Sequence, residues 1–219
     1  MGESMNKKLT KLILIRHGES LANAAHIYLG HTDWDLSERG KKQAREVAEF
    51  LRDEKVDAIY SSDLIRAYNT ALPNSELHGL EIIRSRELRE INLGVWEGKP
   101  LSELEEKWPN EFLHDWRECF GTFSIEGGES VPHLAERIYR EVLRIGRAHL
   151  GETVIIACHA AAIRAFWGKI TKTPAEEVAA KIPFPYNASC TTVFCDGEEL
   201  IPGEYGIAHY LKPESSADA

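Results

Sequence analysis

Two histidines, two arginines and one glutamate follow predicted strands of this chain, close to the points where those strands end. Arg16 and His17 come directly after the apolar run "LILI", and His159 comes directly after "VIIAC". Arg66 follows "AIYSS" by a few residues, and Glu90 follows "EIIRS" in the same way. Imidazoles, guanidinium groups and a carboxylic acid that converge on one rim are suited to phosphoryl transfer.

Each of these residue types has its own use in such a reaction. Forked guanidinium donors at Arg16 and Arg66 match the negative charge that a phosphoryl group spreads over three oxygens. A neutral imidazole at His17 is a competent nucleophile at pH 7 if its other nitrogen donates to a backbone carbonyl. His159 could donate to the equatorial oxygens as charge develops. Glu90 could protonate the leaving alkoxide and then act as base for the water that hydrolyses a phosphohistidine.

The elements that must position these residues alternate between strand and helix patterns. Strands are predicted in "KLILI", "VDAIYSS", "LEIIRS" and "ETVIIACH", and a late edge strand in "SCTTVFCDG". The helix that Asp63 opens is expected to stop before Pro73, because proline is a helix breaker. This order predicts an α/β fold of three layers, a mainly parallel sheet with helices on both faces. In such sheets the ligand site lies beyond the carboxyl ends of the strands, which is where the polar residues fall.

The chain is expected to form one domain. At 219 residues and 43% hydrophobic it can bury one sizeable core. We assign residues 11–212 to this domain, with a flexible N-terminus at 1–10 and a flexible tail at 213–219. Short helices rich in Trp and Phe at about 95–130 predict a cap-like excursion over one face of the sheet.

The charge balance excludes some partners. The formal net charge is -9, unlike a chain that binds nucleic acid through a broad basic face, so any anion must be held by a local cluster of arginines. No apolar stretch approaches the length of a membrane span and the start lacks a signal region, so we expect a cytoplasmic protein with no membrane partner. The sequence leaves the oligomeric state open.

Cysteines and the remaining histidines show no metal-binding spacing. Cys119, Cys158, Cys190 and Cys195 lack C-x-x-C spacing and are expected to be reduced and mostly buried, and a catalytic thiol at Cys158 is disfavoured. The other seven histidines are interpreted as surface or loop residues: His26, His31, His78, His114, His133, His149 and His209. No metal site is expected. Glu129 is interpreted as a helix-start residue rather than a second acid, with a substrate contact as the alternative.

Four stretches of the sequence resemble the successive signatures of a known family. These are "LILIRHGESLANAAHIYLGHTDWDLSERGKKQA", "YSSDLIRAYNTA", "LREINLGVWEG" and "ACHAAAIR", in order from Leu12 to Arg164. They are similar to the histidine phosphatase superfamily, in the branch that contains phosphoglycerate mutases and small-molecule phosphatases. A lone R-H-G is a weak motif, but four signatures in the expected order are specific.

The resemblance implies roles for individual residues. It implies that His17 is the phosphorylated nucleophile and that Glu90 is the proton donor. It also implies that four side chains contact the phosphate: Arg16, Asn23, Arg66 and His159. Asn23 is included because it lies six residues after the nucleophile. No metal or organic cofactor is implied.

The sequence departs from the family's pattern at Ala160, where the family usually has glycine after its second histidine. If the site needs a positive φ at this position, alanine would be strained. If only the backbone N–H is needed, alanine serves. We expect the second case and count Ala160 among the phosphate-binding residues.

The resemblance implies a phosphomonoesterase for a small phosphorylated metabolite. The alternative is a cofactor-dependent phosphoglycerate mutase, which returns the phosphoryl group from the same histidine to its substrate. The short, Glu-rich segment "VWEGKPLSELEEKW" favours the phosphatase over the longer, more basic insertion of mutases. Phosphatases for α-ribazole phosphate or a sugar bisphosphate stay open, and so does a weakly active phosphate-binding regulatory module.

Overall fold

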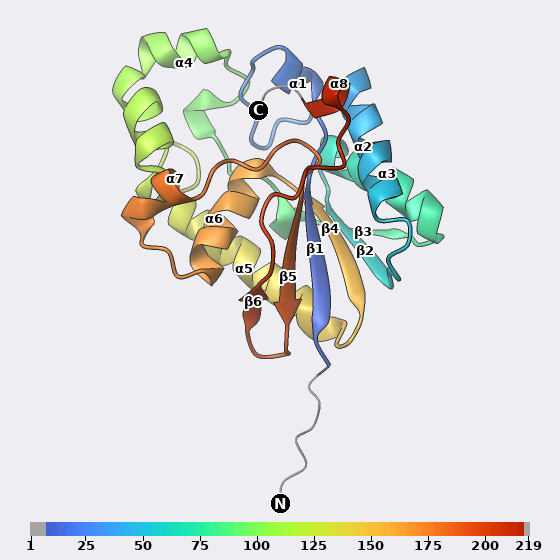
Figure 1. Cartoon of the computed structure of the whole chain (residues 1–219). Coiled ribbons are helices and arrows are strands. Elements are labelled where there is room, and N and C mark those ends of the chain that lie inside the picture. The colour runs from blue at the N-terminus through green and yellow to red at the C-terminus, as the bar shows by residue number, and fades with distance from the viewer. Residues whose placement is uncertain (1–7, 217–219) are drawn as a thin grey trace, which may run out of the picture.

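A six-stranded mixed sheet forms the centre of the protein, whose computed structural model describes residues 8–216 (Figure 1). The strand order is β3-β2-β4-β1-β5-β6; the first four strands are mutually parallel, β5 is antiparallel to β1, and β6 is antiparallel to β5. The strands are β1 (Thr10–Arg16), β2 (Ala58–Ser62), β3 (Ile82–Ser85), β4 (Thr153–Cys158), β5 (Cys190–Cys195) and β6 (Leu200–Pro202). The predicted α/β fold with a mainly parallel sheet is confirmed.

Helices cover both faces of the sheet, with α2 and α3 on one side and α5 and α6 on the other (Figure 1). The α-helices are α1 (Leu21–Ala24), α2 (Glu38–Phe50), α3 (Ile65–His78), α4 (Leu101–Lys107), α5 (Val131–Ala148), α6 (Ala160–Ile170), α7 (Val178–Lys181) and α8 (Pro213–Ser216). Single turns of 3₁₀-helix lie at η1 (Arg86–Leu88), η2 (Gly94–Trp96), η4 (Phe120–Thr122) and η5 (Ala175–Glu177), and η3 (Asn110–Trp116) is a π-helix.

The central strand β1 is apolar along its length because both of its faces are covered. Successive strand residues point to opposite faces. Leu12 and Leu14 therefore join the core under α5 and α6, whereas Ile13 and Ile15 join the core under α2 and α3. Two-sided burial explains the continuous run "LILI", which an alternating pattern would not produce.

An aromatic cluster anchors the segment between the sheet and α5. Edge-to-face or tilted ring pairs with centroids 5.1 to 6.2 Å apart link its members, which are Trp96, Phe112, Trp116, Phe120 and Phe123. These rings belong to the same core as α5 and α6. The excursion expected at 95–130 thus contains α4, η3 and η4 and packs on that side of the molecule.

The prediction that the third helix stops before Pro73 is wrong, because α3 continues to His78. A proline inside a helix costs about 3 kcal/mol. On α3, however, Ala67, Ala71 and Asn74 are buried at helical spacing on both sides of the proline. Packing of this face against the sheet outweighs the local penalty.

The ends of the chain also differ from the expectation. β1 begins at Thr10, which is fully buried, so the last residue of the stretch expected to be flexible belongs to the central sheet. Pro213–Ser216, expected as part of a flexible tail, forms α8, and the backbone carbonyl of its buried Ser215 accepts a hydrogen bond from Gln43. The expectations for 1–7 and 217–219 lie outside the described residues. No helix in residues 8–216 has the length and apolar character needed to cross a membrane.

Candidate active site

The carboxyl ends of three neighbouring parallel strands bring the predicted residues together. Arg16 is the last residue of β1, and its register partner on β4 is Cys158. Each of these two strands is followed directly by a histidine. Because the strand ends are paired, the rings of His17 and His159 lie close together, 5.2 Å apart between centroids. Arg66 is the second residue of α3, which follows β2.

Burial sets the properties of His17. The side chain is 5% exposed, and Nδ1 lies 2.7 Å from the carbonyl oxygen of Gly18. Because a carbonyl only accepts, Nδ1 must carry the proton and Nε2 keeps its lone pair. Burial, followed by the charges of Arg66 and Arg16, holds the pKa of His17 well below its usual range. At neutral pH this ring is therefore uncharged, and the lone pair of Nε2 is not used by the bond to Gly18.

His159 is fully buried and carries polar atoms with no partner. Neither ring nitrogen makes a hydrogen bond within the described part of the chain. A buried polar atom without a partner costs about 1–3 kcal/mol, so this ring is set up to bond a further group. Burial, then the charge of Arg66, lowers its pKa well below the ordinary value. Burial also raises the pKa of the adjacent Cys158 thiol, which argues against a thiolate there.

Backbone carbonyls hold the two arginines in place. Arg16 Nη1 donates to the carbonyl of Pro185 at 2.5 Å, while Arg66 donates to the carbonyls of Thr32 and Gly30 at 3.0 and 2.7 Å. Burial lowers the pKa of Arg16 to about 10, so it stays protonated at pH 7. Carbonyls orient a guanidinium without neutralising its charge, and both cations therefore remain available to an anion.

Glu97 holds the loop 30–32 that positions Arg66, a role that the sequence did not indicate. Its carboxylate accepts hydrogen bonds from the amides of Gly30 and His31 at 3.1 and 2.6 Å and from the Thr32 hydroxyl at 2.9 Å. Burial raises the pKa of Glu97, but the hydrogen bonds from His31 and Gly30 outweigh it and leave the pKa below its ordinary value. A charged Glu97 thus fixes the loop whose carbonyls position Arg66.

Glu90 lies at the amino end of α6, beside His159. Its carboxylate accepts hydrogen bonds from the amides of Ala161 and Ala162 at 3.1 and 2.9 Å and from the amide of Ile91 at 2.9 Å. The side chain is 7% exposed. Its charge is the main influence, after burial, on the pKa of both Arg16 and Arg66. The predicted acid therefore belongs to the same group of residues as the predicted cations.

Arg137 of α5 holds the backbone around Glu90 in place through hydrogen bonds. It donates to the carbonyls of Glu87, Arg89 and Glu90 at 2.8, 3.0 and 3.1 Å. Its guanidinium also pairs with Glu129 through Nη2 and Oε2 at 2.7 Å. Glu129 therefore supports the acid loop through Arg137, which agrees with a structural role rather than a second acid.

Asn23 and Ala160, the other two predicted phosphate contacts, have different local roles. Asn23 Oδ1 accepts from the amide and the hydroxyl of Ser20, as part of the cap of α1. No described residue accepts a hydrogen bond from Asn23 Nδ2. Ala160 is the first residue of α6 and is not among the residues with positive φ. Alanine is therefore unstrained at the position where the family usually has glycine.

The comparisons with known proteins agree with this geometry. The sequence profile of the histidine phosphatase superfamily (branch 1) matches residues 12–202. The chain is 40% identical over 159 residues to phosphoserine phosphatase 1 of Hydrogenobacter thermophilus, covering 73% of this chain and 75% of that protein. It is 33% identical over 193 residues to a 2,3-bisphosphoglycerate-dependent phosphoglycerate mutase of Methylorubrum populi, covering 83% and 91%.

Among solved structures, the mycobacterial glucosyl-3-phosphoglycerate phosphatase in complex with VO3 superposes with a TM-score of 0.81 at 29% identity. That match covers 90% of this chain and 99% of the other. The resemblance inferred from the four sequence signatures is confirmed. The ordered signatures, the sheet edge that joins them and the profile match together show that the chain belongs to the histidine phosphatase superfamily.

Proposed function

We propose that the protein is a phosphatase that hydrolyses a small organic phosphomonoester through a phosphohistidine at His17. The observation that carries the proposal is the state of this ring, which is uncharged, has its proton on Nδ1, contacts a second histidine and lies within the electrostatic influence of two buried arginines. A neutral imidazole with a fixed tautomer is the form that attacks phosphorus.

In the first step, His17 Nε2 forms a bond to phosphorus while the bond from phosphorus to the ester oxygen breaks. Arg16 and Arg66 stabilise the charge on the transferring group, and His159 donates to an equatorial oxygen. Glu90 gives its proton to the leaving oxygen, which departs as an alcohol. Oxyanion donors of this kind contribute about 10²- to 10³-fold each to the rate.

In the second step, water attacks the phosphohistidine. Glu90, now a carboxylate, takes the proton from this water, the N–P bond breaks, and inorganic phosphate leaves. The enzyme returns to its starting state, with the N–P bond of His17 cleaved and the proton that Glu90 donated in the first step replaced. Asn23 Nδ2 and the backbone N–H of Ala160 are assigned to phosphate oxygens, since neither makes a hydrogen bond to another described residue.

The relatives support a small metabolite as substrate. Two of the three named above carry the names phosphoserine phosphatase and glucosyl-3-phosphoglycerate phosphatase. Aromatic residues cluster at the cap, where the ring of Tyr28 lies 5.2 Å from that of Phe112 between centroids. An apolar wall beside a cationic phosphate site suits a small organic phosphate.

Phosphoglycerate mutase activity is the second candidate, because a mutase is among the relatives. An inactive phosphate-binding module is the third candidate, and it was suggested by possible backbone strain at Ala160. Because the backbone at Ala160 is unstrained, this reason for expecting an inactive protein no longer holds.

One experiment separates the three functions. Wild type, His17→Ala and the control His209→Ala, an exposed histidine packed near Phe50, are incubated with an aryl phosphate, with phosphoserine, and with 3-phosphoglycerate plus 2,3-bisphosphoglycerate. Phosphate release and isomer formation are followed. In a parallel reaction the substrate carries a labelled phosphoryl group, and rapid quenching traps any enzyme to which this group has been transferred. We expect hydrolysis and an acid-labile, base-stable phosphoenzyme in wild type and His209→Ala alone.

Isomer formation without net phosphate release would favour the mutase. Phosphate binding without turnover in wild type would favour the binding module. Equal hydrolysis by His17→Ala would refute the phosphohistidine mechanism.

A further inference from the structure

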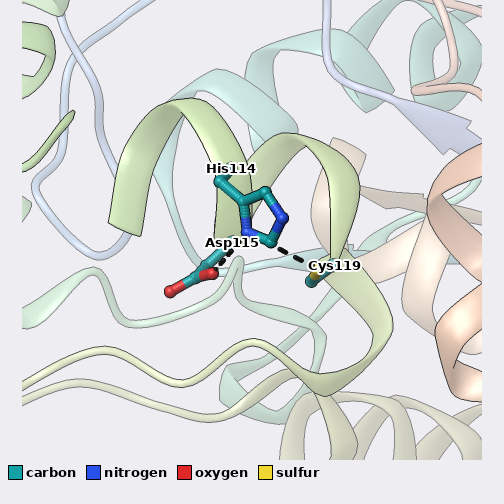
Figure 2. Close-up of side chains that lie close together, drawn as sticks. All are labelled: His114, Asp115 and Cys119. Atoms are coloured by element: carbon teal, nitrogen blue, oxygen red, sulfur yellow. Dashed lines mark hydrogen bonds and ion pairs between the residues drawn. The ribbon is translucent and has the colours of Figure 1, made fainter. Parts of the chain in front are cut away.

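The outer face of the cap gathers a histidine, an aspartate and a cysteine that the proposed reaction does not use (Figure 2). His114 and Asp115 belong to η3, and Cys119 follows three residues after its end. His114 Nδ1 lies 2.9 Å from Asp115 Oδ1 and 3.8 Å from Cys119 Sγ. The three potential ligand atoms all lie within 4.8 Å of one another. One imidazole nitrogen, one carboxylate oxygen and one thiol sulfur therefore lie close together on the surface.

The π-helical turn is what brings His114 and Cys119 together. In an α-helix, five residues correspond to a rotation of about 500°, which leaves the two side chains about 140° apart around the axis. Here η3 is π-helical, and the amide of Cys119 donates both to the carbonyl of His114 at 3.3 Å and to that of Asp115 at 3.1 Å, so the end of this helix is wider than an α-helical turn. The two side chains therefore lie on the same side of the helix. Wide turns of this kind occur frequently at functional sites.

The donor set and its spacing fit a zinc ion. Zinc is bound by imidazole, thiolate and carboxylate at about 2.0–2.3 Å, which in a tetrahedral site places nitrogen and sulfur about 3.6 Å apart and nitrogen and oxygen about 3.4 Å apart. The observed separations of 3.8 and 2.9 Å lie within half an ångström of these values. Small side-chain rotations of exposed residues suffice to reach them. A water molecule would take the fourth position.

The surroundings of His114 also fit a metal ligand. A ligating histidine usually has its other nitrogen near a carboxylate, which fixes the ring. Here Nε2 of His114 lies 3.9 Å from Oε2 of Glu118, on the side away from Asp115. Cys119 is half-exposed, whereas Cys158, Cys190 and Cys195 are buried, so it is the accessible thiol of this chain. A thiolate that solvent can reach is available to a dissolved metal ion.

We propose that His114, Asp115 and Cys119 bind one zinc ion on the outer face of η3. The opposite face of this helix buries Phe112 and Trp116 in the aromatic cluster of the cap. The ion joins the body of η3 to the residue that follows it and so stabilises the helix that supports this cluster. This site is separate from the phosphate site, and its existence does not depend on the proposed phosphatase activity.

Metal titration of the full chain tests the proposal. Protein treated with a chelator is titrated with Zn²⁺ in competition with a chromophoric chelator, and with Co²⁺ while the near-ultraviolet thiolate-to-cobalt band is recorded. We expect one equivalent to bind more tightly than millimolar and to produce this band. Cys119→Ser is expected to abolish the band, and His114→Ala to weaken binding by at least about tenfold.

Controls use residues outside the cluster. All three ligands are at least partly exposed, so the substitutions leave the core intact, and circular dichroism checks folding. His209→Ala is expected to bind the metal as wild type does. Binding weaker than millimolar in wild type, or an unchanged cobalt band in Cys119→Ser, would overturn the proposal. Phosphatase assays of the same variants are separate readouts and do not decide it.

Discussion

Replacing Glu97 by glutamine tests whether a residue without a chemical role controls phosphate binding. Its carboxylate holds the loop 30–32 through the amides of Gly30 and His31, and the carbonyls of Gly30 and Thr32 hold Arg66. Glutamine keeps one acceptor oxygen but presents an NH₂ group where the other oxygen stood. At least two of the backbone or hydroxyl groups that donate to Glu97 then face the NH₂ group of the glutamine, which cannot accept their hydrogen bonds.

The magnitude follows from these contacts. A hydrogen bond to a charged group contributes about 1.5–3 kcal/mol. Glu97 is only half-buried, so the lower value applies, and the loss of two such bonds lowers the free energy of unfolding by about 3 kcal/mol. If Arg66 also loses one bond to phosphate, the inhibition constant of inorganic phosphate rises about tenfold or more, since 1.4 kcal/mol corresponds to a factor of ten.

The assay measures inhibition of aryl phosphate hydrolysis by inorganic phosphate, together with urea unfolding. Glu97→Gln is compared with Arg66→Ala, with the double variant and with the control Glu103→Gln, whose carboxylate contacts the surface residues Lys99 and Lys107. We expect the effects of Glu97 and Arg66 on phosphate affinity to be strongly non-additive, because both act through one guanidinium. Wild-type affinity in Glu97→Gln, or full additivity in the cycle, would refute the reasoning.

Two further predictions concern backbone strain and pH. Because φ of Ala160 is not positive, Ala160→Gly is expected to lower the free energy of unfolding by up to about 1 kcal/mol in urea melts; higher stability would mean that alanine is strained there. Burial holds the pKa of His17 and of His159 well below the unfolded value near 6.5, so the unfolded chain binds protons that the native site does not. The free energy of unfolding should therefore fall as pH decreases below about 6.5, by up to about 1.4 kcal/mol per pH unit for each histidine. Urea melts from pH 7.5 to 5 should show a shallower decrease in His159→Asn, and an identical pH dependence would contradict this account.

The parts of the site that follow strand ends were predictable from sequence. Arg16, His17 and His159 lie immediately after apolar runs, and parallel strands deliver such residues to one edge. The supporting residues Glu97 and Arg137 act through backbone groups that lie far from them in the sequence, so no local pattern marks their targets. The signal that the sequence does carry for Glu97 is its place in the stretch "LREINLGVWEG", which resembles a family signature.

Two local features could not be predicted because tertiary packing or hydrogen-bond register decides them. Pro73 indicates a helix end, yet the burial of Ala71 and Asn74 on either side extends α3 past it. His114 and Cys119 show no metal-binding spacing if the segment is an α-helix. Only the π-helical register, which side-chain composition does not reveal, places them on the same side.

The position of β4 between β1 and β2 has a consequence for the order of folding. The two histidines of the site follow β1 and β4, which are neighbours in the sheet although five α-helices (α1 to α5) and two strands (β2 and β3) separate them along the chain. β4 is synthesised after its neighbours on both sides and must insert between them, and such long-range pairing is slow to form. During refolding, secondary structure should therefore return before the two imidazoles meet. Recovery of activity would then report the time at which the last central strand takes its place in the sheet.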